Sequence, residues 1–293
     1  MKKLALIGAN GQLSTDIRKV FDKDFYSITP LTHQDIEVTD ITNVKKVLEG
    51  INPDIVINTS AYHKVDEVED NPDKAFLVNA SAQKNIAELC QSKGWTTVFI
   101  STDYVFGLDE KRNTPFSEAD NTGPVNVYGT SKLAGENFTR YIADRHFVIR
   151  VCGLHGTAGS SGKGGNFVEL MIRLGKEKGQ VSVVDDQTCT PTYTKNIAEN
   201  LNELLKTDNY GLYHMTSQGQ CSWYEFASEI FKQMKMKVEC NPVDSSHFPT
   251  RAKRPKYSVL ENKNLKKINL DMMRGWKENL TLYLKEKGYI YKI

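Results

Sequence analysis

A chain of 293 residues is long enough to bury a large core, either as one elaborated domain or as a main domain with a smaller one folded onto it. Lysine and arginine number 38 against 36 aspartates and glutamates, and both signs are mixed along the chain, so the formal net charge is only +2. This charge gives no electrostatic footprint for nucleic acid or an anionic membrane, and no apolar run approaches a membrane span. We therefore expect neither a nucleic-acid nor a membrane partner.

The N-terminus and the cysteines bear on location. The run Met1–Ile7 is too short, and too quickly followed by glycine, to predict a signal peptide. The cysteines are odd in number and scattered, with no C-x-x-C pair and no clustered histidines, which argues against a disulfide framework and a zinc site. We expect a cytoplasmic protein with no bound metal. The cysteines are Cys90, Cys152, Cys189, Cys221 and Cys240.

The first half alternates short β-branched runs with longer helical stretches, a pattern typical of a parallel sheet covered by helices on both faces. The predicted elements, in chain order, are a strand 4–7, a helix 12–21, a strand 25–28, a helix 44–49, a strand 55–58, a helix 73–93, a strand 97–100, a helix 127–143, a strand 147–151, a helix 166–178 and a strand 181–184. We predict an α/β fold with a doubly wound, Rossmann-type parallel sheet.

From about residue 185 the chain consists of shorter pieces: a helix 195–205, a strand 211–215, an amphipathic helix 223–234, a basic, proline-containing stretch 248–257 and a terminal helix 273–287. We therefore predict an NAD(P)-binding domain over 1–184 and a smaller, mainly substrate-binding part over 185–293. Strands and helices can be shared between the two.

A glycine loop directly follows the first predicted strand and opens the first helix. Glycine at Gly8 permits a tight turn, and Gly11 lets backbone N–H groups approach a pyrophosphate closely. Ser14 stands where such loops usually carry a third glycine. Many strand-turn-helix units carry glycines only for turning, but the position of this loop favours a dinucleotide site.

In such folds, the residue at the end of the second strand contacts the ribose 2′ position of the dinucleotide. The chain continues there as Thr29–His33 without an acidic residue, and Asp35 arrives late. A neutral strand end does not repel a 2′-phosphate, so either NADPH or NADH is expected as the cofactor.

Tyr128 and Lys132 are four residues apart, so a helix would project both side chains from one face. A free phenol has a pKa of about 10, and a nearby cation makes it a usable acid-base group. Such a pair also occurs by chance on exposed helices. Thr102 favours the interpretation as a catalytic pair, because it follows the fourth predicted strand, and doubly wound sheets bind ligands at such strand ends. Its hydroxyl can polarise a substrate carbonyl while Tyr128 supplies the proton.

In these motifs the chain resembles the extended short-chain dehydrogenase/reductases, and within them the dTDP-4-dehydrorhamnose reductases. That family reduces the 4-keto group of a dTDP-linked 6-deoxy sugar with NAD(P)H to give dTDP-L-rhamnose. The likeness covers nearly the whole chain and is carried by the segments 8–13, 58–62, 65–66, 101–106, 128–136, 184–187, 191–192, 222–227 and 252–258.

The resemblance implies the roles of individual residues. Thr102, Tyr128 and Lys132 are expected to be catalytic. Expected cofactor contacts are Gly8, Asn10, Gly11, Gln12 and Leu13 at the pyrophosphate loop, Asp40 and Ile41 at the adenine, and Ala61, Tyr62, His63, Tyr128 and Lys132 toward the nicotinamide. Expected substrate contacts are Thr102, Asp103, Tyr104, Gly153 and Arg254, the last because a guanidinium fork fits phosphate oxygens. A solvated surface arginine is the other reading of Arg254.

The chain departs from the family after the fifth strand. The family usually carries Arg-Thr-Ser/Ala-Trp there, whereas this chain reads Arg150-Val151-Cys152-Gly153. Loss of the large aromatic side chain predicts a more open sugar pocket, and the Gly- and Ser-rich insertion Thr157–Gly165 is expected to refill it. His63 is expected to pack or hydrogen-bond.

Three functions follow from these observations. The first is reduction of dTDP-4-dehydro-L-rhamnose, with a dTDP-linked 4-keto-6-deoxy sugar as the partner molecule and a homodimer as the assembly considered. The second is a reductase or epimerase of a different nucleotide sugar, for which Gly153 is the main support. The third is a non-catalytic, NADP-binding regulatory subunit, against which the intact Thr102, Tyr128 and Lys132 argue.

Overall fold

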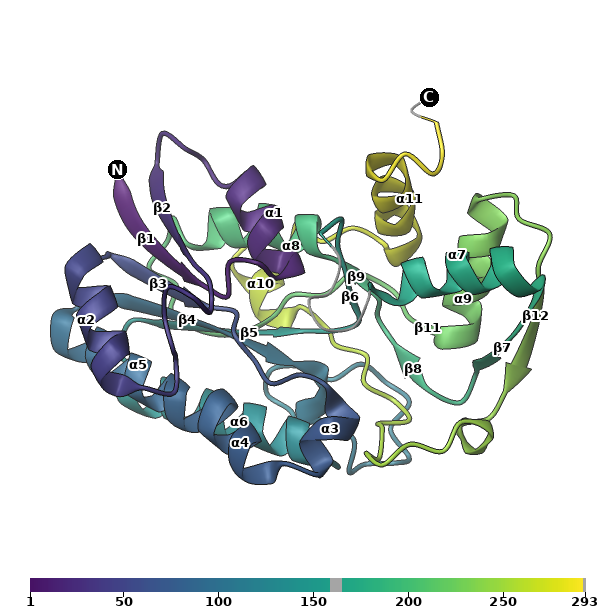
Figure 1. Ribbon diagram of the computed structural model, residues 1–293, viewed down its shortest axis with the longest axis horizontal. Helices are drawn as coiled ribbons and strands as arrows, with labels where there is room; N and C mark the ends of the chain where they lie inside the picture. The colour runs from purple at the N-terminus through teal and green to yellow at the C-terminus, as the bar shows by residue number, and fades with distance from the viewer. Residues whose placement is uncertain (159–164, 292–293) are drawn as a thin grey trace.

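The computed structural model of the chain describes residues 1–158 and 165–291. Its main sheet has six parallel strands in the order β10-β5-β4-β3-β1-β2 (Figure 1). They are β1 (Lys2–Ile7), β2 (Tyr26–Leu31), β3 (Ile55–Asn58), β4 (Thr96–Thr102), β5 (His146–Val151) and β10 (Gly211–His214). The sheet grows outward in opposite directions from β1 and β3, so the topological switch point lies between these two strands.

Alternating side chains of the strands pack on opposite faces of this sheet. Leu4 and Leu6 belong to one apolar cluster with α1 (Gln12–Val20) and α8 (Thr194–Leu204). Ala5 and Ile7 belong to another cluster, with α2 (Ile41–Ile51) and α5 (Ala82–Lys93). In Figure 1, α6 (Val127–Ile142) lies on the same side as α2 and α5. Both faces are thus covered, and the predicted doubly wound α/β fold is confirmed.

The second half of the chain contributes to both parts of the molecule. The strand β7 (Gln180–Val184), expected with the strands of the first domain, instead pairs with β12 (Glu239–Val243) in a separate two-stranded sheet. The strand β10, from beyond residue 184, joins β5 in the main sheet, where Leu212 packs with Phe99 and Val148. Apolar runs predict strands, but only packing decides which sheet each strand enters.

We call the six-stranded sheet with its helices the larger lobe. The smaller lobe comprises β7, β12 and three helices that share one apolar cluster: α7 (Phe167–Lys178), α9 (Trp223–Gln233) and α11 (Trp276–Glu286). In Figure 1 the two lobes lie side by side, and the short strand pairs β6–β9 and β8–β11 lie between them.

The remaining elements are short. The predicted helix 73–93 is realised as α4 (Pro72–Phe76), a π-helical turn (Leu77–Ser81) and α5. The others are α3 (Val65–Glu69), a 3₁₀ turn (Asp103–Val105), β6 (Leu154–His155), β8 (Thr188–Cys189), β9 (Thr192–Tyr193), β11 (Cys221–Ser222), a 3₁₀ turn (Ser245–His247) and α10 (Lys263–Lys267). None of the helices in the described part of the chain has the length and apolarity that a membrane span needs.

Candidate active site

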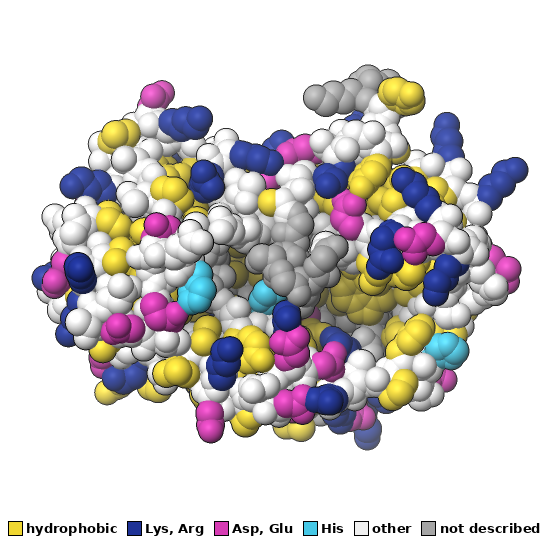
Figure 2. Space-filling model, viewed as in Figure 1, with side chains coloured by type: hydrophobic (Ala, Val, Ile, Leu, Met, Phe, Trp, Pro, Cys, Tyr) yellow, Lys and Arg dark blue, Asp and Glu magenta, His cyan; other side chains and the backbone are white. Residues whose placement is uncertain are grey.

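A cleft of about 1130 Å³ runs between the two lobes, along the carboxyl ends of the main strands. Figure 2 shows this hollow near the centre of the molecule, with hydrophobic side chains gathered on its smaller-lobe side. The loops after β1 and β3, the two strands at the switch point, both line it. The cleft therefore lies where doubly wound sheets bind their ligands.

The glycine loop opens onto this cleft. Gly8 has a φ of +82°, and a Cβ atom there would lie 2.5 Å from Thr59 Oγ1, so only glycine fits. Gly11 precedes α1, which carries no acidic residue in its first turn. Ser14, which replaces the usual third glycine, is buried and shares a 2.8 Å hydrogen bond with Thr59. The loop therefore keeps the helix N-terminus free for an anionic group such as a pyrophosphate.

The chain after β2 forms the wall next to the glycine loop. His33 and Glu37 both line the cleft, and His33 Nδ1 lies 3.4 Å from the Glu37 carboxylate. Hydrogen bonds from the Thr39 hydroxyl and N–H lower the pKa of Glu37, so its carboxylate is ionised at neutral pH. An acid thus faces the cleft after β2, although the strand end itself is neutral.

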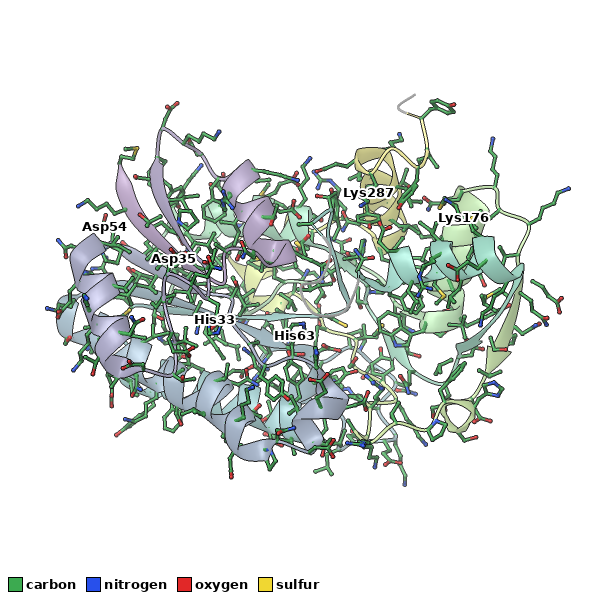
Figure 3. All side chains as sticks on the ribbon, in the orientation of Figure 1. His33, Asp35, Asp54, His63, Lys176 and Lys287 are labelled. Carbon is green, nitrogen blue, oxygen red and sulfur yellow. The ribbon has the colours of Figure 1, made fainter. Side chains whose placement is uncertain are left out.

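Figure 3 shows His33 and His63 on the part of the larger lobe that faces the cleft. His63 Nδ1 lies 3.3 Å from the carbonyl oxygen of Ala61, consistent with the expected hydrogen-bonding role. The neighbouring Tyr62 is held by Asn79, whose side chain accepts from its N–H at 2.9 Å and donates to its carbonyl at 3.1 Å. Asn79 lies in the π-helical turn and also donates to Ser131 of α6 at 3.0 Å. It therefore ties the cofactor wall to the helix that carries Tyr128.

Thr102 and Tyr128 meet at the centre of the cleft. The nearby Thr102 hydroxyl acts to lower the pKa of Tyr128. Burial, reinforced by the negative charge of Asp103, outweighs this effect and raises that pKa above its usual value. Tyr128 is consequently a neutral phenol, the form that can donate a proton.

Asp103 is almost fully buried and accepts hydrogen bonds from neutral groups. Ser258 donates to its Oδ2 at 2.6 Å, the Cys152 thiol to the same atom at 3.1 Å, and Thr102 to its Oδ1 at 3.1 Å. Burial raises its pKa, against the effect of these bonds. Asp103 therefore fixes the orientation of the Thr102 hydroxyl. Because it also accepts from Cys152, it connects Thr102 to the segment that contains Cys152.

Lys132 is 1% exposed, one turn of α6 beyond Tyr128. Burial lowers its pKa to about 7, although the nearby Glu136 acts in the opposite direction. Its ammonium lies 3.9 Å from the centre of the Phe99 ring. Glu136 is itself committed to Arg150, with a 2.7 Å contact between the two buried side chains. Lys132 is therefore only partly protonated near neutral pH. A bound ligand that interacts with a cation would favour its protonated form.

The substrate side of the cleft contains Tyr104, Gly153 and Arg254. Arg254 Nη1 donates to the Tyr104 hydroxyl at 3.3 Å, and Nη2 pairs with Asp66 at 2.8 Å. Burial raises the pKa of Tyr104 to about 12, and its ring meets that of Tyr128 edge-on at 5.8 Å. Arg254 is thus a half-buried, paired side chain in the cleft wall, in contrast to the reading as a solvated surface arginine.

The cleft brings together every residue expected at the site except two. Asp40 caps α2, accepting hydrogen bonds from the N–H groups of Thr42 and Asn43, and it lies outside the cleft lining together with Ile41. The insertion 157–165, expected to refill the pocket, lies for the most part outside the described residues. Sequence reasoning missed the lining residues Thr32, His33, Glu37, Lys74, Phe167 and Trp223. The search for an acid beyond the strand end reached Asp35, and extending it by two residues would have found Glu37, which lines the cleft.

The fold and this arrangement define the class of extended short-chain dehydrogenase/reductases. A crystal structure of dTDP-4-dehydrorhamnose reductase from Bacillus anthracis in complex with NADP is 38% identical, with a TM-score of 0.92 over 97% of this chain and 99% of that one. The spore coat polysaccharide biosynthesis protein SpsK of Bacillus subtilis is 34% identical over 98% of this chain and 99% of its own. The dTDP-4-dehydrorhamnose reductase of Streptomyces griseus is 33% identical over 94% of this chain and 90% of its own.

The family model described as RmlD substrate binding domain matches residues 1–288, and the chain belongs to this family. The resemblance stated from the sequence is confirmed, and so are the enzyme class and the choice of NADPH or NADH as cofactor.

Proposed function

We propose that this chain reduces the 4-keto group of dTDP-4-dehydro-L-rhamnose with NADPH or NADH to give dTDP-L-rhamnose. The observation that carries the proposal is that Thr102, Tyr128 and Lys132 line the same cleft as the glycine loop. Each of these groups has a separate task in reducing a carbonyl.

The cofactor would be held along the larger-lobe wall. The cradle at Gly8, which a Cβ atom would fill, and the free N-terminus of α1 fit a pyrophosphate. Ala61, Tyr62 and His63 would line the path toward the nicotinamide, and Lys132 would meet its ribose. When bound, the nicotinamide supplies a hydride for the carbonyl carbon.

The protein supplies the proton and the polarisation. Thr102 donates a hydrogen bond to the carbonyl oxygen, and neutral Tyr128 transfers its phenolic proton to that oxygen as negative charge develops. The resulting phenolate would be stabilised by Lys132, because a nearby cation favours the ionised form. Arg254 would bind the substrate diphosphate, after exchanging part of its pairing with Asp66.

The test is turnover. The purified protein is supplied with NADPH or NADH and with dTDP-4-dehydro-L-rhamnose generated in situ by the upstream enzymes, and nicotinamide absorbance is followed. We expect oxidation of the cofactor and formation of dTDP-L-rhamnose. Absence of turnover on this sugar, with turnover on another nucleotide-linked keto sugar, would favour the second candidate, a reductase or epimerase of a different nucleotide sugar, for which Gly153 is the specific observation.

Tight cofactor binding without turnover on any keto sugar would instead favour the regulatory-subunit alternative. The presence of Thr102, Tyr128 and Lys132 together in the cleft speaks against it, because a binding subunit needs no proton donor. A cytoplasmic location, supported by the free cysteines of the described residues, and a homodimer remain predictions. Size-exclusion chromatography with light scattering would test the dimer.

A further inference from the structure

Gly153 lines the cleft between the groups proposed to be catalytic and the smaller lobe. It directly follows Cys152, whose thiol bonds to Asp103 behind Thr102. Its φ is +53°, and a Cβ atom there would lie 3.1 Å from Pro191 Cα and 3.5 Å from the ring of Trp223. The space beside Gly153 is therefore bounded on one side by a backbone and on the other by an aromatic ring.

Trp223 belongs to an aromatic group that lines the cleft. Its ring centre is 4.7 Å from that of Phe167, and both side chains are half-buried and face the cleft. Phe226 stacks behind Phe167 at 5.7 Å and is fully buried in the smaller-lobe core. We call Trp223 and Phe167 the aromatic wall.

The backbone holds the aromatic wall rigidly. Trp223 is the first residue of α9, behind a capping box in which Ser222 Oγ accepts from the Glu225 N–H at 3.0 Å and the Glu225 carboxylate accepts from the Ser222 N–H at 2.8 Å. Phe167 is the first residue of α7, whose cap Asn166 accepts from the Glu169 N–H at 3.1 Å. The N-termini of α7 and α9 are thus both capped, and their first residues place two aromatic rings on the same part of the cleft wall.

We infer that the aromatic wall is a subsite for the carbohydrate ring of the substrate, with Trp223 as its main contact. The inference rests on the proposed function and names the part of that site that receives the sugar. A pyranose has an apolar C–H face, larger in a 6-deoxy sugar because a methyl group replaces a hydroxymethyl group. Burying such a face against a rigid aromatic ring is favourable and needs no charged partner. Gly153, beside Trp223, follows Cys152, which bonds to the same carboxylate as Thr102, so the wall continues from the segment behind Thr102.

The nucleoside of the substrate is the other group that could stack on Trp223. If Trp223 contacts the sugar, its loss weakens binding only of the ligand that carries the sugar. If it contacts the nucleoside, its loss weakens binding of both dTDP ligands. Binding of dTDP, which lacks the sugar, is compared with binding of dTDP-L-rhamnose, in the presence of NADP⁺, for the wild type and for Trp223→Ala. We expect the variant to bind dTDP-L-rhamnose about tenfold more weakly, a loss typical of one apolar contact, and dTDP less than about twofold more weakly. Equal losses for both ligands, or none for either, overturn the inference.

Matched variants separate this effect from damage to the fold. Tyr224→Ala changes the next residue of α9, which is half-buried and does not line the cleft, and should leave both affinities unchanged. Trp223→Phe keeps a ring and should retain dTDP-L-rhamnose binding to within about threefold. The other two tryptophans, Trp95 and Trp276, are each 7% exposed, so a fluorescence change caused by dTDP-L-rhamnose should disappear in Trp223→Phe. Its persistence would count against contact with Trp223.

Wild-type turnover of the dTDP-linked keto sugar is measured first. Its absence contradicts the proposed function and the inference with it. Turnover by the wild type combined with equal losses for the two ligands in Trp223→Ala contradicts the inference alone.

Discussion

The two ends of the cleft are built on different physical principles. At the end expected to be catalytic, Thr102, Asp103 and Lys132 are buried and Tyr128 is half-buried, and burial shifts the pKa values of Asp103, Tyr128 and Lys132. At the smaller-lobe end, Trp223 and Phe167 form an apolar wall set by helix caps. The groups proposed for the chemistry thus lie in a few short segments, whereas the residues proposed to contact the sugar come from segments that are far apart in the chain.

The largest effect should come from the catalytic end. Tyr128→Phe removes the proton donor without changing the ring, and kcat should fall by about 10²- to 10⁴-fold, with the dissociation constant for NADPH nearly unchanged. Tyr141→Phe is the matched control, since Tyr141 lies on the same helix and is 87% exposed. A Tyr128→Phe enzyme of near wild-type rate would remove Tyr128 from the mechanism.

Lys132→Met tests the cost of burying a cation. Burial lowers the pKa of Lys132 from 10.5 to about 7, so between these pH values the unfolded chain binds more protons than the folded one, and stability rises with pH. The cost is complete below about pH 7 and is gone above about pH 10.5. We expect the variant to be more stable than the wild type by a few kcal/mol at pH 6.5, since each pKa unit is worth about 1.4 kcal/mol, while losing activity.

Urea unfolding at pH 6.5 and pH 9.5 measures this difference. The gap between variant and wild type should shrink at the higher pH. A gap that is independent of pH would mean that packing, and not the charge, sets the stability of this position.

A smaller effect is expected at the cofactor wall. The ionised Glu37 carboxylate would repel a 2′-phosphate more than a 2′-hydroxyl. Glu37→Gln should therefore raise the ratio of kcat/KM for NADPH to that for NADH by about three- to tenfold, which corresponds to at most about 1.4 kcal/mol. Asp35→Asn removes the same charge from a nearby residue that does not line the cleft. An equal shift in both variants would assign the effect to the overall field.

The smallest effect concerns the aromatic wall. Ser222→Ala removes the capping bond in front of Trp223 and should lower the free energy of unfolding by about 1 kcal/mol. The KM for the sugar nucleotide should rise modestly, because Trp223 is less well fixed, whereas the KM for NADPH should not change. Ser222→Thr keeps the capping oxygen and should behave like the wild type. Equal rises in both KM values would indicate a general loss of structure.

Local sequence predicted five strands of the main sheet and most of the residues that line the cleft. The alternation of strands and helices, the turn at Gly8 and the four-residue spacing of Tyr128 and Lys132 are short-range features, and their context in the chain predicted one shared cleft. The strand at 55–58 was predicted with the bounds that the structure shows. Period and spacing determine these features because each depends on neighbours within one element.

The tertiary structure decided the remainder. It moved the strand at 180–184 into the smaller lobe and brought β10 beside β5, because strand pairing depends on distant partners. It turned Asp40 into a helix cap and brought Glu37 to the cleft, which depends on how the chain bends after β2. The sequence by itself determined the fold and the class of a nicotinamide-dependent reductase, and it predicted a Thr-Tyr-Lys site. Only packing brought Trp223 and Phe167 to Gly153, since these residues come from three separate segments that meet nowhere but in the folded chain.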